Sequence, residues 1–207
     1  KMFFQRGSFS CDNLKISLVS SSDTILPGLT SELINISHKR LKSLEIYLLN
    51  EASSRVPTDD YAYLSNGTKI YNSFLIFTGG VEASKITEEL DVAKNGRGQI
   101  IVNEYMQSDK YDNIFAIGDA AEIRNKKDEV MPPNVTIARI SGINAGKNIL
   151  NKIRNKKLIK CDPKLDGILI ALGGKFAAGN IYGLFHVEGR IAYEIKKHVF
   201  DSYRKPL

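Results

Sequence analysis

Several features are scarce in this 207-residue sequence, and each scarcity excludes a class of protein. Only two cysteines occur, Cys11 and Cys161, and they form no CxxC pair and have no histidine nearby at ligand spacing. No metal site is therefore expected, and free thiols in a reducing, cytoplasmic compartment are the expected state of both cysteines. No stretch of 18 apolar residues occurs, so the sequence predicts no membrane-spanning helix.

The charge balance is basic, with 29 Lys and Arg residues against 23 Asp and Glu residues and a net charge of +6. The basic residues are dispersed or sit in short tracts such as 151–160. Such tracts indicate a solvated face, with a membrane surface or another anionic partner as the alternative. No nucleic-acid-binding motif accompanies the charge, so nucleic acid is not an expected partner.

Apolar spacing along the chain predicts strands that alternate with helices, which is typical of an α/β fold. The expected elements are strand 14–22, helix 30–44 capped by Thr30 or Ser31, strand 45–56, a hairpin turning at Asn66-Gly67, a buried strand within 74–80, strands 99–102 and 114–117, helix 134–153 and helix 189–203. Further strands are expected between residues 167 and 188.

The stretch "NIFAIGDAAEI" (113–123) carries the chemistry, because an apolar run ends in Gly-Asp and is expected to lead into a helix. Glycine lets a ligand approach the backbone, and the N–H groups of a first helical turn attract phosphate. Asp119 would repel phosphate, but its carboxylate suits the hydroxyls of a sugar or ribityl chain, with the amides around Ala120 and Ala121 facing the anion. A strand followed by an aspartate that merely caps a helix is the alternative.

This stretch resembles the second flavin-binding motif of the FAD-dependent pyridine nucleotide-disulfide oxidoreductase superfamily. Residues 96–121 are similar to the segment that leads to this motif in that family: a strand, a short variable segment and then the strand that ends in Gly-Asp. "FLIFTGGVEAS" (74–84) resembles the family's strand and glycine turn where the chain crosses between domains. The resemblance implies an α/β, FAD/NAD(P)-binding, Rossmann-like two-domain flavoprotein fold, present only as a C-terminal part. It implies domains at 1–80 (partial nicotinamide-binding), 81–165 (C-terminal part of the FAD-binding domain) and 166–207 (interface region).

Two further segments, 15–29 and 166–200, resemble type II NADH dehydrogenases within that superfamily. These enzymes are peripheral membrane flavoproteins that pass electrons from NADH through FAD to a quinone. The resemblance implies a FAD-dependent oxidoreductase with NAD(P)H as donor and a quinone or similar electron acceptor. It also implies a cytoplasmic protein at the inner face of the cell membrane. The amphipathic helix near the C-terminus is expected to contact a membrane surface or a second subunit of a homodimer, unless it only packs in the core.

The resemblance assigns no catalytic acid or base, because the cofactors carry the chemistry. Asp119 is expected to anchor FAD, and the helix after Pro132-Pro133 is expected to point its positive end at the flavin ring. Lys175, in a glycine turn, is expected to place positive charge near the flavin or quinone. The complete set of expected cofactor-binding residues is Gly118, Asp119, Ala120, Asn134, Val135, Thr136 and Lys175.

Three departures from the family pattern change the expectation. No GxGxxG fingerprint occurs, so the chain alone is expected to bind FAD poorly and to be inactive. Three serines, residues 20–22, stand where the family has the acid that holds the adenosine ribose of NADH. The first acid after them is Asp23. A serine there would tolerate NADPH, or the pocket binds no nicotinamide. Thr136 and Ile140 stand where the family usually has glutamines near the quinone.

These departures keep two alternatives open. The first is a sulfide:quinone oxidoreductase-like flavoprotein, an architecture that uses a cysteine pair at the flavin. Cys161 would be one member, and an inert thiol is the competing interpretation. The second is a non-catalytic dimerisation or membrane-docking module derived from such a flavoprotein.

Overall fold

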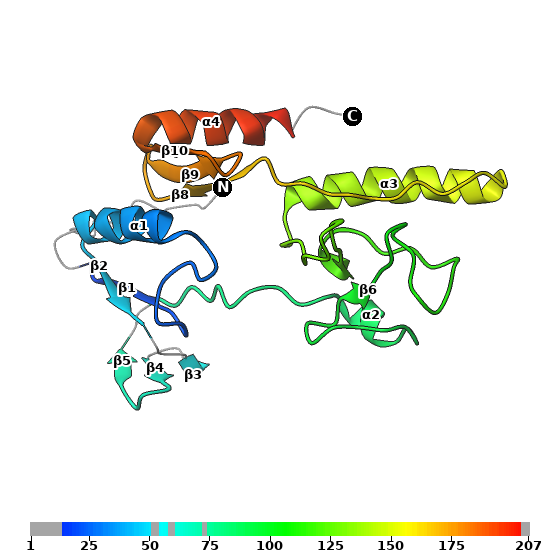
Figure 1. Cartoon of the computed structure of the whole chain (residues 1–207). Helices are drawn as coiled ribbons and strands as arrows, with labels where there is room; N and C mark the ends of the chain where they lie inside the picture. The colour runs from blue at the N-terminus through cyan, green and yellow to red at the C-terminus, as the bar shows by residue number, and fades with distance from the viewer. Residues whose placement is uncertain (1–13, 51–53, 58–60, 72–73, 204–207) are drawn as a thin grey trace. The chain divides into compact units, whose positions relative to one another are not determined.

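The computed structural model describes residues 14–50, 54–57, 61–71 and 74–203. The chain divides into two compact units. Unit 1 is formed from two segments, 1–77 and 167–207, and unit 2 is the continuous segment 78–166. Unit 1 contains β1 to β5, α1, β8 to β10 and α4, whereas unit 2 contains α2, β6, a short 3-10 turn called η2, β7 and α3 (Figure 1).

Unit 1 begins with a strand–helix–strand arrangement. β1 (Ile16–Val19) pairs in parallel with β2 (Ile46–Leu49), and α1 (Ser31–Ser43) connects them. The predicted cap is confirmed, because the Thr30 side chain accepts a hydrogen bond from the Leu33 amide at 3.4 Å. The carboxyl ends of β1 and β2 therefore meet at one edge of a parallel sheet.

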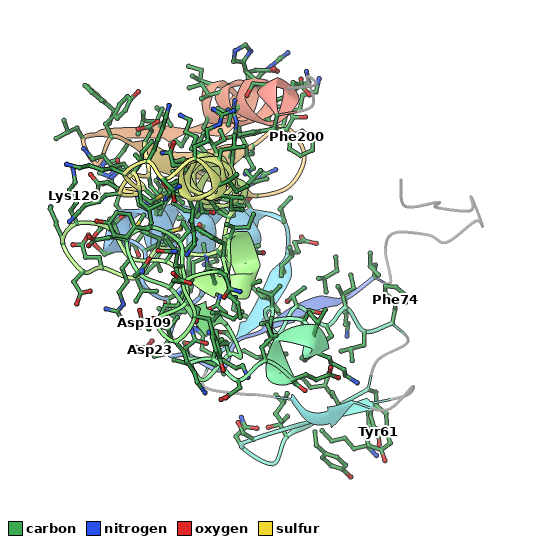
Figure 2. The ribbon with its side chains drawn as sticks, turned by 90° about the vertical axis from the view of Figure 1, so that its right-hand side faces the viewer. Asp23, Tyr61, Phe74, Asp109, Lys126 and Phe200 are labelled. Atoms are coloured by element: carbon green, nitrogen blue, oxygen red, sulfur yellow. The ribbon has the colours of Figure 1, made fainter. Side chains whose placement is uncertain are left out.

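The hairpin predicted at Asn66-Gly67 is confirmed and belongs to a three-stranded antiparallel sheet of β3 (Ser54–Pro57), β4 (Tyr61–Leu64) and β5 (Lys69–Tyr71). The buried strand predicted next is wrong. Residues 74–77 form no strand with the described part of the chain. Phe74, labelled in Figure 2, is 82% exposed, and Phe77 is 76% exposed. The run has the composition of a buried strand, but no described segment lies beside it to pair with it.

The second part of unit 1 is an antiparallel sheet covered by a helix. β8 (Gly167–Ala171), β9 (Ala177–Ile181) and β10 (Phe185–Glu188) pair in sequence order, and α4 (Gly189–Ser202), predicted at 189–203, packs against them. Leu33 of α1 packs with Leu172 and Ala178 in a small core. Arg40 of α1 also donates hydrogen bonds to the Leu172 and Gly173 carbonyls at 3.3 and 3.4 Å, which ties the two segments of unit 1 together.

Unit 2 has one long helix and very short strands. Helix α3 (Val135–Ile153) agrees with the predicted helix 134–153. The predicted strand 99–102 is present as β6 (Ile100–Ile101), which pairs in parallel with β7 (Ala121–Glu122), and α2 (Lys85–Glu88) precedes them. The predicted strand 114–117 is wrong, because Phe115 makes only an isolated bridge with Gln107.

Asparagines organise three hairpin loops of the same form in unit 2. Asn95, Asn103 and Asn125 each accept, through Oδ1, hydrogen bonds from the amides two and four residues later. In each loop the residue three positions on has a positive φ, +72° at Gly98, +67° at Met106 and +63° at Asp128. This is a type I turn followed by a bulge. Side-chain capping of turns thus replaces regular strand pairing in much of the unit.

Two buried asparagines of α3 hold the segment that follows it. The Asn148 side chain, fully buried, donates hydrogen bonds to the Tyr105 and Ile159 carbonyls at 3.0 Å and accepts one from the Ile159 amide at 2.8 Å. Asn144 also donates to the Ile159 carbonyl at 3.0 Å. The chain after α3 is therefore folded back along the helix by polar groups that the apolar pattern does not report.

Candidate functional site

The Gly-Asp stretch forms a single tight turn. Ile117 is extended, Gly118 has a φ of +57°, and Gly118–Ala120 make the 3-10 turn η2. The chain then continues directly into β7, and the Ala121 amide donates to the Gly118 carbonyl. The expectation of a helix after Asp119 is therefore wrong, and the Ala121 amide is occupied by the turn itself. A helix that could attract phosphate must be another element.

That other element is α3, against which the turn is held. The Gly118 amide donates a hydrogen bond to the Ser141 hydroxyl at 3.1 Å, and that hydroxyl donates to the Ile137 carbonyl at 2.8 Å. A Cβ atom at position 118 would lie 3.2 Å from the Cβ atom of Ala138. Glycine is needed here both for the positive φ and for the close approach to the helix.

The turn exposes the Asp119 side chain. The Asp119 carbonyl accepts a hydrogen bond from the Gln99 side chain at 3.0 Å, which fixes the backbone. Its carboxylate is exposed and, within the described part of the chain, makes no hydrogen bond or ion pair. Gln99 and Ser141 were not predicted, since each is recognised only through a contact with the turn that is distant in sequence. The geometry leaves one negatively charged acceptor available to a ligand.

The beginning of α3 lies at the same end of unit 2 as this turn. Asn134 caps the helix, accepting a hydrogen bond from the Ile137 amide at 3.0 Å, and Val135 is 56% exposed. Because Asn134 precedes Ala138 by about one turn, the structure brings the Asn134–Thr136 and Gly118–Ala120 groups together. Lys175 lies in unit 1, on the exposed turn between β8 and β9, so its predicted place near the flavin or quinone stays a prediction.

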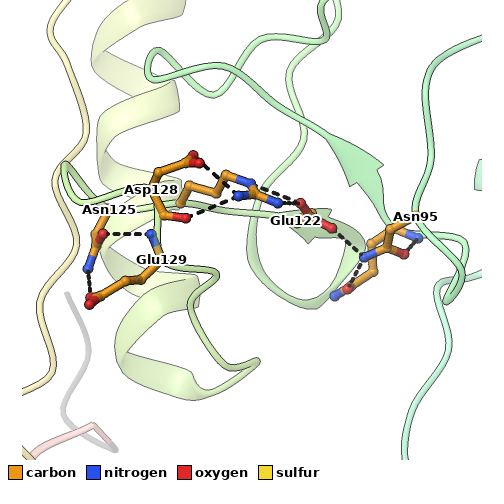
Figure 3. Close-up of polar contacts among 7 residues, drawn as sticks. Asn95, Glu122, Asn125, Asp128 and Glu129 are labelled. Carbon is orange, nitrogen blue, oxygen red and sulfur yellow. Dashed lines mark hydrogen bonds and ion pairs between the residues drawn. The ribbon is translucent and has the colours of Figure 1, made fainter.

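A polar network supports the strand that follows the turn (Figure 3). The Glu122 carboxylate accepts hydrogen bonds from the Asn95 side chain at 3.0 Å and from Arg124 at 2.8 and 3.0 Å. These hydrogen bonds hold the pKa of Glu122 below its usual value, and the bond from Asn95 has the largest effect. Arg124 reaches on to Asp128 at 3.2 Å. The network is structural, since it joins Glu122 of β7 to the Asn95 loop and, through Arg124, to the Asn125 loop.

The other candidate edge, at the carboxyl ends of β1 and β2, lies in unit 1. The Ser20 amide donates to the Leu49 carbonyl at 2.9 Å, so the parallel pairing continues to the first serine. The Ser20 hydroxyl donates to the Thr24 carbonyl at 3.2 Å and accepts from the Ser22 amide at 3.3 Å. Asn50, after β2, donates to the Asp23 carbonyl at 3.0 Å. The serines thus form an ordered turn at the strand ends.

Cys161 has the properties of a structural thiol. It is 5% exposed, packs in the core with Met106 and Ile137, and donates its amide to the Glu104 carbonyl at 2.7 Å. Burial raises its pKa, which disfavours the reactive thiolate. The structure therefore gives no support to a redox role for Cys161, and Cys11 lies outside the described residues.

Comparison with protein families gives one match over most of the chain. The family model described as pyridine nucleotide-disulphide oxidoreductase matches residues 5–142. A type II NADH:quinone oxidoreductase of Haemophilus influenzae is 25% identical over 180 residues, which is 86% of this chain but 40% of that protein. The chain therefore spans less than half of the length of this curated relative.

Solved structures share the fold at low identity. NDH2 from Plasmodium falciparum in complex with NADH has a TM-score of 0.79 and 14% identity, covering 93% of this chain and 55% of that one. The sulfide:quinone oxidoreductase of Aquifex aeolicus has a TM-score of 0.69 and 16% identity, covering 91% and 48%. Both likenesses establish the FAD/NAD(P)-binding oxidoreductase fold over part of those chains.

Proposed function

Because the chain belongs to the pyridine nucleotide-disulphide oxidoreductase family, we propose that it forms part of an NAD(P)H:quinone oxidoreductase of the type II NADH dehydrogenase kind. Membership of the family implies FAD and NAD(P)H as cofactor and reductant. The finer parts of this proposal are the quinone acceptor and dependence of the activity on FAD. They are supported by the curated relative, which is named a type II NADH:quinone oxidoreductase.

The observation that carries the proposal is the turn at Gly118–Ala120, held against the start of α3 with the Asp119 carboxylate exposed. An exposed carboxylate without a protein partner fits the hydroxyls of a ribityl chain. The N-terminal end of α3 favours negative charge, so it fits the pyrimidine end of a flavin, with Asn134 to Thr136 nearest. When bound, FAD supplies two-electron redox chemistry between the nicotinamide and the acceptor.

FAD binding to the intact oxidoreductase of which this chain is proposed to form part tests this assignment, with each substitution made in that protein. The Asp119→Asn variant should bind FAD at least about tenfold more weakly, because a charge-assisted hydrogen bond contributes about 1.5–3 kcal/mol. Its free energy of unfolding should change by less than about 0.5 kcal/mol, since the side chain is exposed. Asp109→Asn, an exposed acid of the same unit, is the control and should bind FAD normally. Equal FAD affinity of Asp119→Asn and the unsubstituted chain would overturn the assignment.

The donor and acceptor require a separate experiment. In the intact oxidoreductase of which this chain is proposed to form part, anaerobic titration with NADH, NADPH and sulfide should bleach the flavin absorbance with a nicotinamide and not with sulfide. Reoxidation by a short-chain quinone should restore the absorbance. Bleaching by sulfide alone would favour the sulfide:quinone oxidoreductase alternative, against which the burial of Cys161 already weighs.

A peripheral membrane position is the last part of the proposal. Among the described residues no helix is long and apolar enough to cross a bilayer. The tip of the β9–β10 hairpin and the start of α4 expose large apolar side chains, including Leu184 at 77%, Ile191 at 70% and Phe185 at 63%. The protein should co-sediment with vesicles that contain anionic lipids. Leu184→Lys should reduce the fraction of protein that sediments with them. The same exposed residues are the alternative site of a homodimer contact, which sedimentation in the absence of lipid would detect.

A further inference from the structure

Two Asn-Gly pairs occur in the sequence, Asn66-Gly67 and Asn95-Gly96. Asparagine before glycine is prone to lose its side-chain amide spontaneously, because glycine has no Cβ to shield its backbone nitrogen. That nitrogen can attack the Cγ atom of the asparagine and close a cyclic imide, a succinimide. The two pairs are equivalent in sequence, so their hydrogen bonds in the folded chain decide which of them reacts.

The Asn95 side chain is held from both of its ends. Its Oδ1 accepts hydrogen bonds from the Arg97 and Gln99 amides at 2.9 and 3.1 Å. Its Nδ2 donates to the Gln99 side chain at 2.9 Å and to the Glu122 carboxylate at 3.0 Å. Loss of Nδ2 from Asn95 would break both of these donated bonds and would place a new carboxylate beside that of Glu122. Both effects oppose the reaction at Asn95.

The Asn66 side chain is held much less firmly. Asn66 is exposed in the turn between β4 and β5, and among the described residues its side chain makes one hydrogen bond, in which Oδ1 accepts from the Thr68 amide at 3.0 Å. The Gly67 amide donates to the Leu64 carbonyl at 3.0 Å. Few bonds need to break before the Gly67 nitrogen is free to attack, so local opening should expose this pair more often than the pair at Asn95.

We propose that Asn66 is a site of spontaneous deamidation in the folded protein, and that its hydrogen bonds protect Asn95 from the same reaction. The Gly67 nitrogen loses its proton to solvent and forms a bond to Cγ of Asn66. The Cγ–Nδ2 bond breaks, and Nδ2 leaves as ammonia after taking a proton from water. Water then opens the succinimide: addition at Cγ gives aspartate, and addition at the main-chain carbonyl carbon gives isoaspartate.

The isoaspartate product would disturb the hairpin as well as add a negative charge. It lengthens the main chain of the turn by a methylene group, and the geometry of a turn sets the register of its strands. The present register pairs Tyr61, labelled in Figure 2, with Tyr71. The Lys69 ammonium lies over the Tyr61 ring, with Nζ 3.8 Å from the ring centroid. The modification should loosen these contacts and leave the Asp119 turn unchanged, because that turn belongs to the other unit.

Peptide mapping by mass spectrometry, on full-length protein incubated in mildly alkaline buffer, tests the proposal. Conversion should be at least about tenfold faster at Asn66 than at Asn95 in the folded protein. In strong denaturant the two pairs should react at similar rates, because the hydrogen bonds that distinguish them are lost. Asn66→Gln should abolish conversion at position 66, since the longer side chain would have to close a larger ring. Glu122→Ala removes a bond from Asn95 and should speed conversion there without an effect at Asn66.

Equal rates at the two sites in the folded protein, or a faster rate at Asn95, would overturn the inference. Absence of conversion at Asn66 in the folded protein, with conversion of both pairs in denaturant, would also overturn it. A preference for Asn66 that persisted in denaturant would show that local sequence, and not hydrogen bonding, protects Asn95. None of these measurements depends on FAD or a nicotinamide, so the inference and the proposed function are tested separately.

Discussion

At the scale of single residues, Gly118 is a position where the backbone conformation and the packing both require glycine. Gly118→Ala should lower the free energy of unfolding of unit 2 by about 1–2 kcal/mol, the cost of a left-handed backbone for a residue with a Cβ. The added Cβ would also meet Ala138 at 3.2 Å. Denaturant titration measures the change.

Gly96→Ala is the matched control for this prediction. Gly96 lies in the same unit, lacks a positive φ, and has no atom within 4 Å of the Cβ position. Its substitution should leave stability unchanged or slightly raised. If both variants lost the same stability, the close packing of the Gly118 turn on α3 would not be the cause.

Glu122 gives a prediction about pH. The pKa of Glu122 is lower in the folded state than its ordinary value of 4.5, which applies in the unfolded chain. The ionised carboxylate therefore stabilises the fold fully above pH 4.5, and this contribution is lost as the pH falls through the folded-state pKa. Glu122→Gln should lower stability by about 1–2 kcal/mol at pH 7. The difference between the variant and the parent should shrink steadily below pH 4.5.

Glu104→Gln serves as the comparison, since a hydrogen bond from Lys160 also lowers the pKa of Glu104. The Glu104 side chain is 48% exposed against 11% for Glu122, so solvent screens its pair. Its substitution should change stability at pH 7 much less than Glu122→Gln does. Equal effects of the two substitutions would show that Glu122 is no more than a surface charge.

At the scale of elements, a buried asparagine of α3 is expected to contribute strongly to the stability of unit 2. Asn148→Leu should lower the stability of unit 2 by about 3 kcal/mol, because the Ile159 amide and the Tyr105 carbonyl, which lie in part-buried hydrogen bonds, would lose the Asn148 side chain as their partner. Asn151→Leu on the same helix loses only one exposed bond, to Lys157, and should cost less than about 1 kcal/mol. Hydrogen exchange at the Ile159 amide gives an independent measurement. Retained protection there in Asn148→Leu would contradict the proposed role.

The elements also show what the sequence could predict. Helices α1, α3 and α4 follow from apolar spacing of 3.6 residues, with the cap at Thr30 and the proline before α3 as local signals. The apolar runs 74–77 and 114–117 predict buried strands, but a strand needs a partner and composition does not say where that partner is. Asp119 was predicted from the Gly-Asp pair that ends an apolar run and from the resemblance of that stretch to a flavin-binding motif. Its supports, Gln99 and Ser141, lie 20 residues from Asp119 and 23 residues from Gly118, and no local pattern links them to the turn.

At the scale of the whole molecule, the two units have separate cores and should respond separately to substitution. Leu33→Ala removes a side chain that is 1% exposed from the core of unit 1 and should cost that unit about 3 kcal/mol. Segment-resolved hydrogen exchange should show faster exchange in α1 and β9 and unchanged exchange in α3. Asn148→Leu should give the reverse pattern. Equal acceleration in both units would indicate one cooperative fold.

The interruption of unit 1 by unit 2 has a consequence for the order of events on the ribosome. Arg40 and the Leu172 carbonyl that it binds are separated by 132 residues, so α1 is synthesised long before its partners. At ordinary rates of translation the interval is on the order of 10 s. Throughout that time the apolar face of α1 is outside the ribosome without β8 to β10 to cover it. Such a nascent chain is expected to bind a chaperone until β8 to β10 have left the exit tunnel.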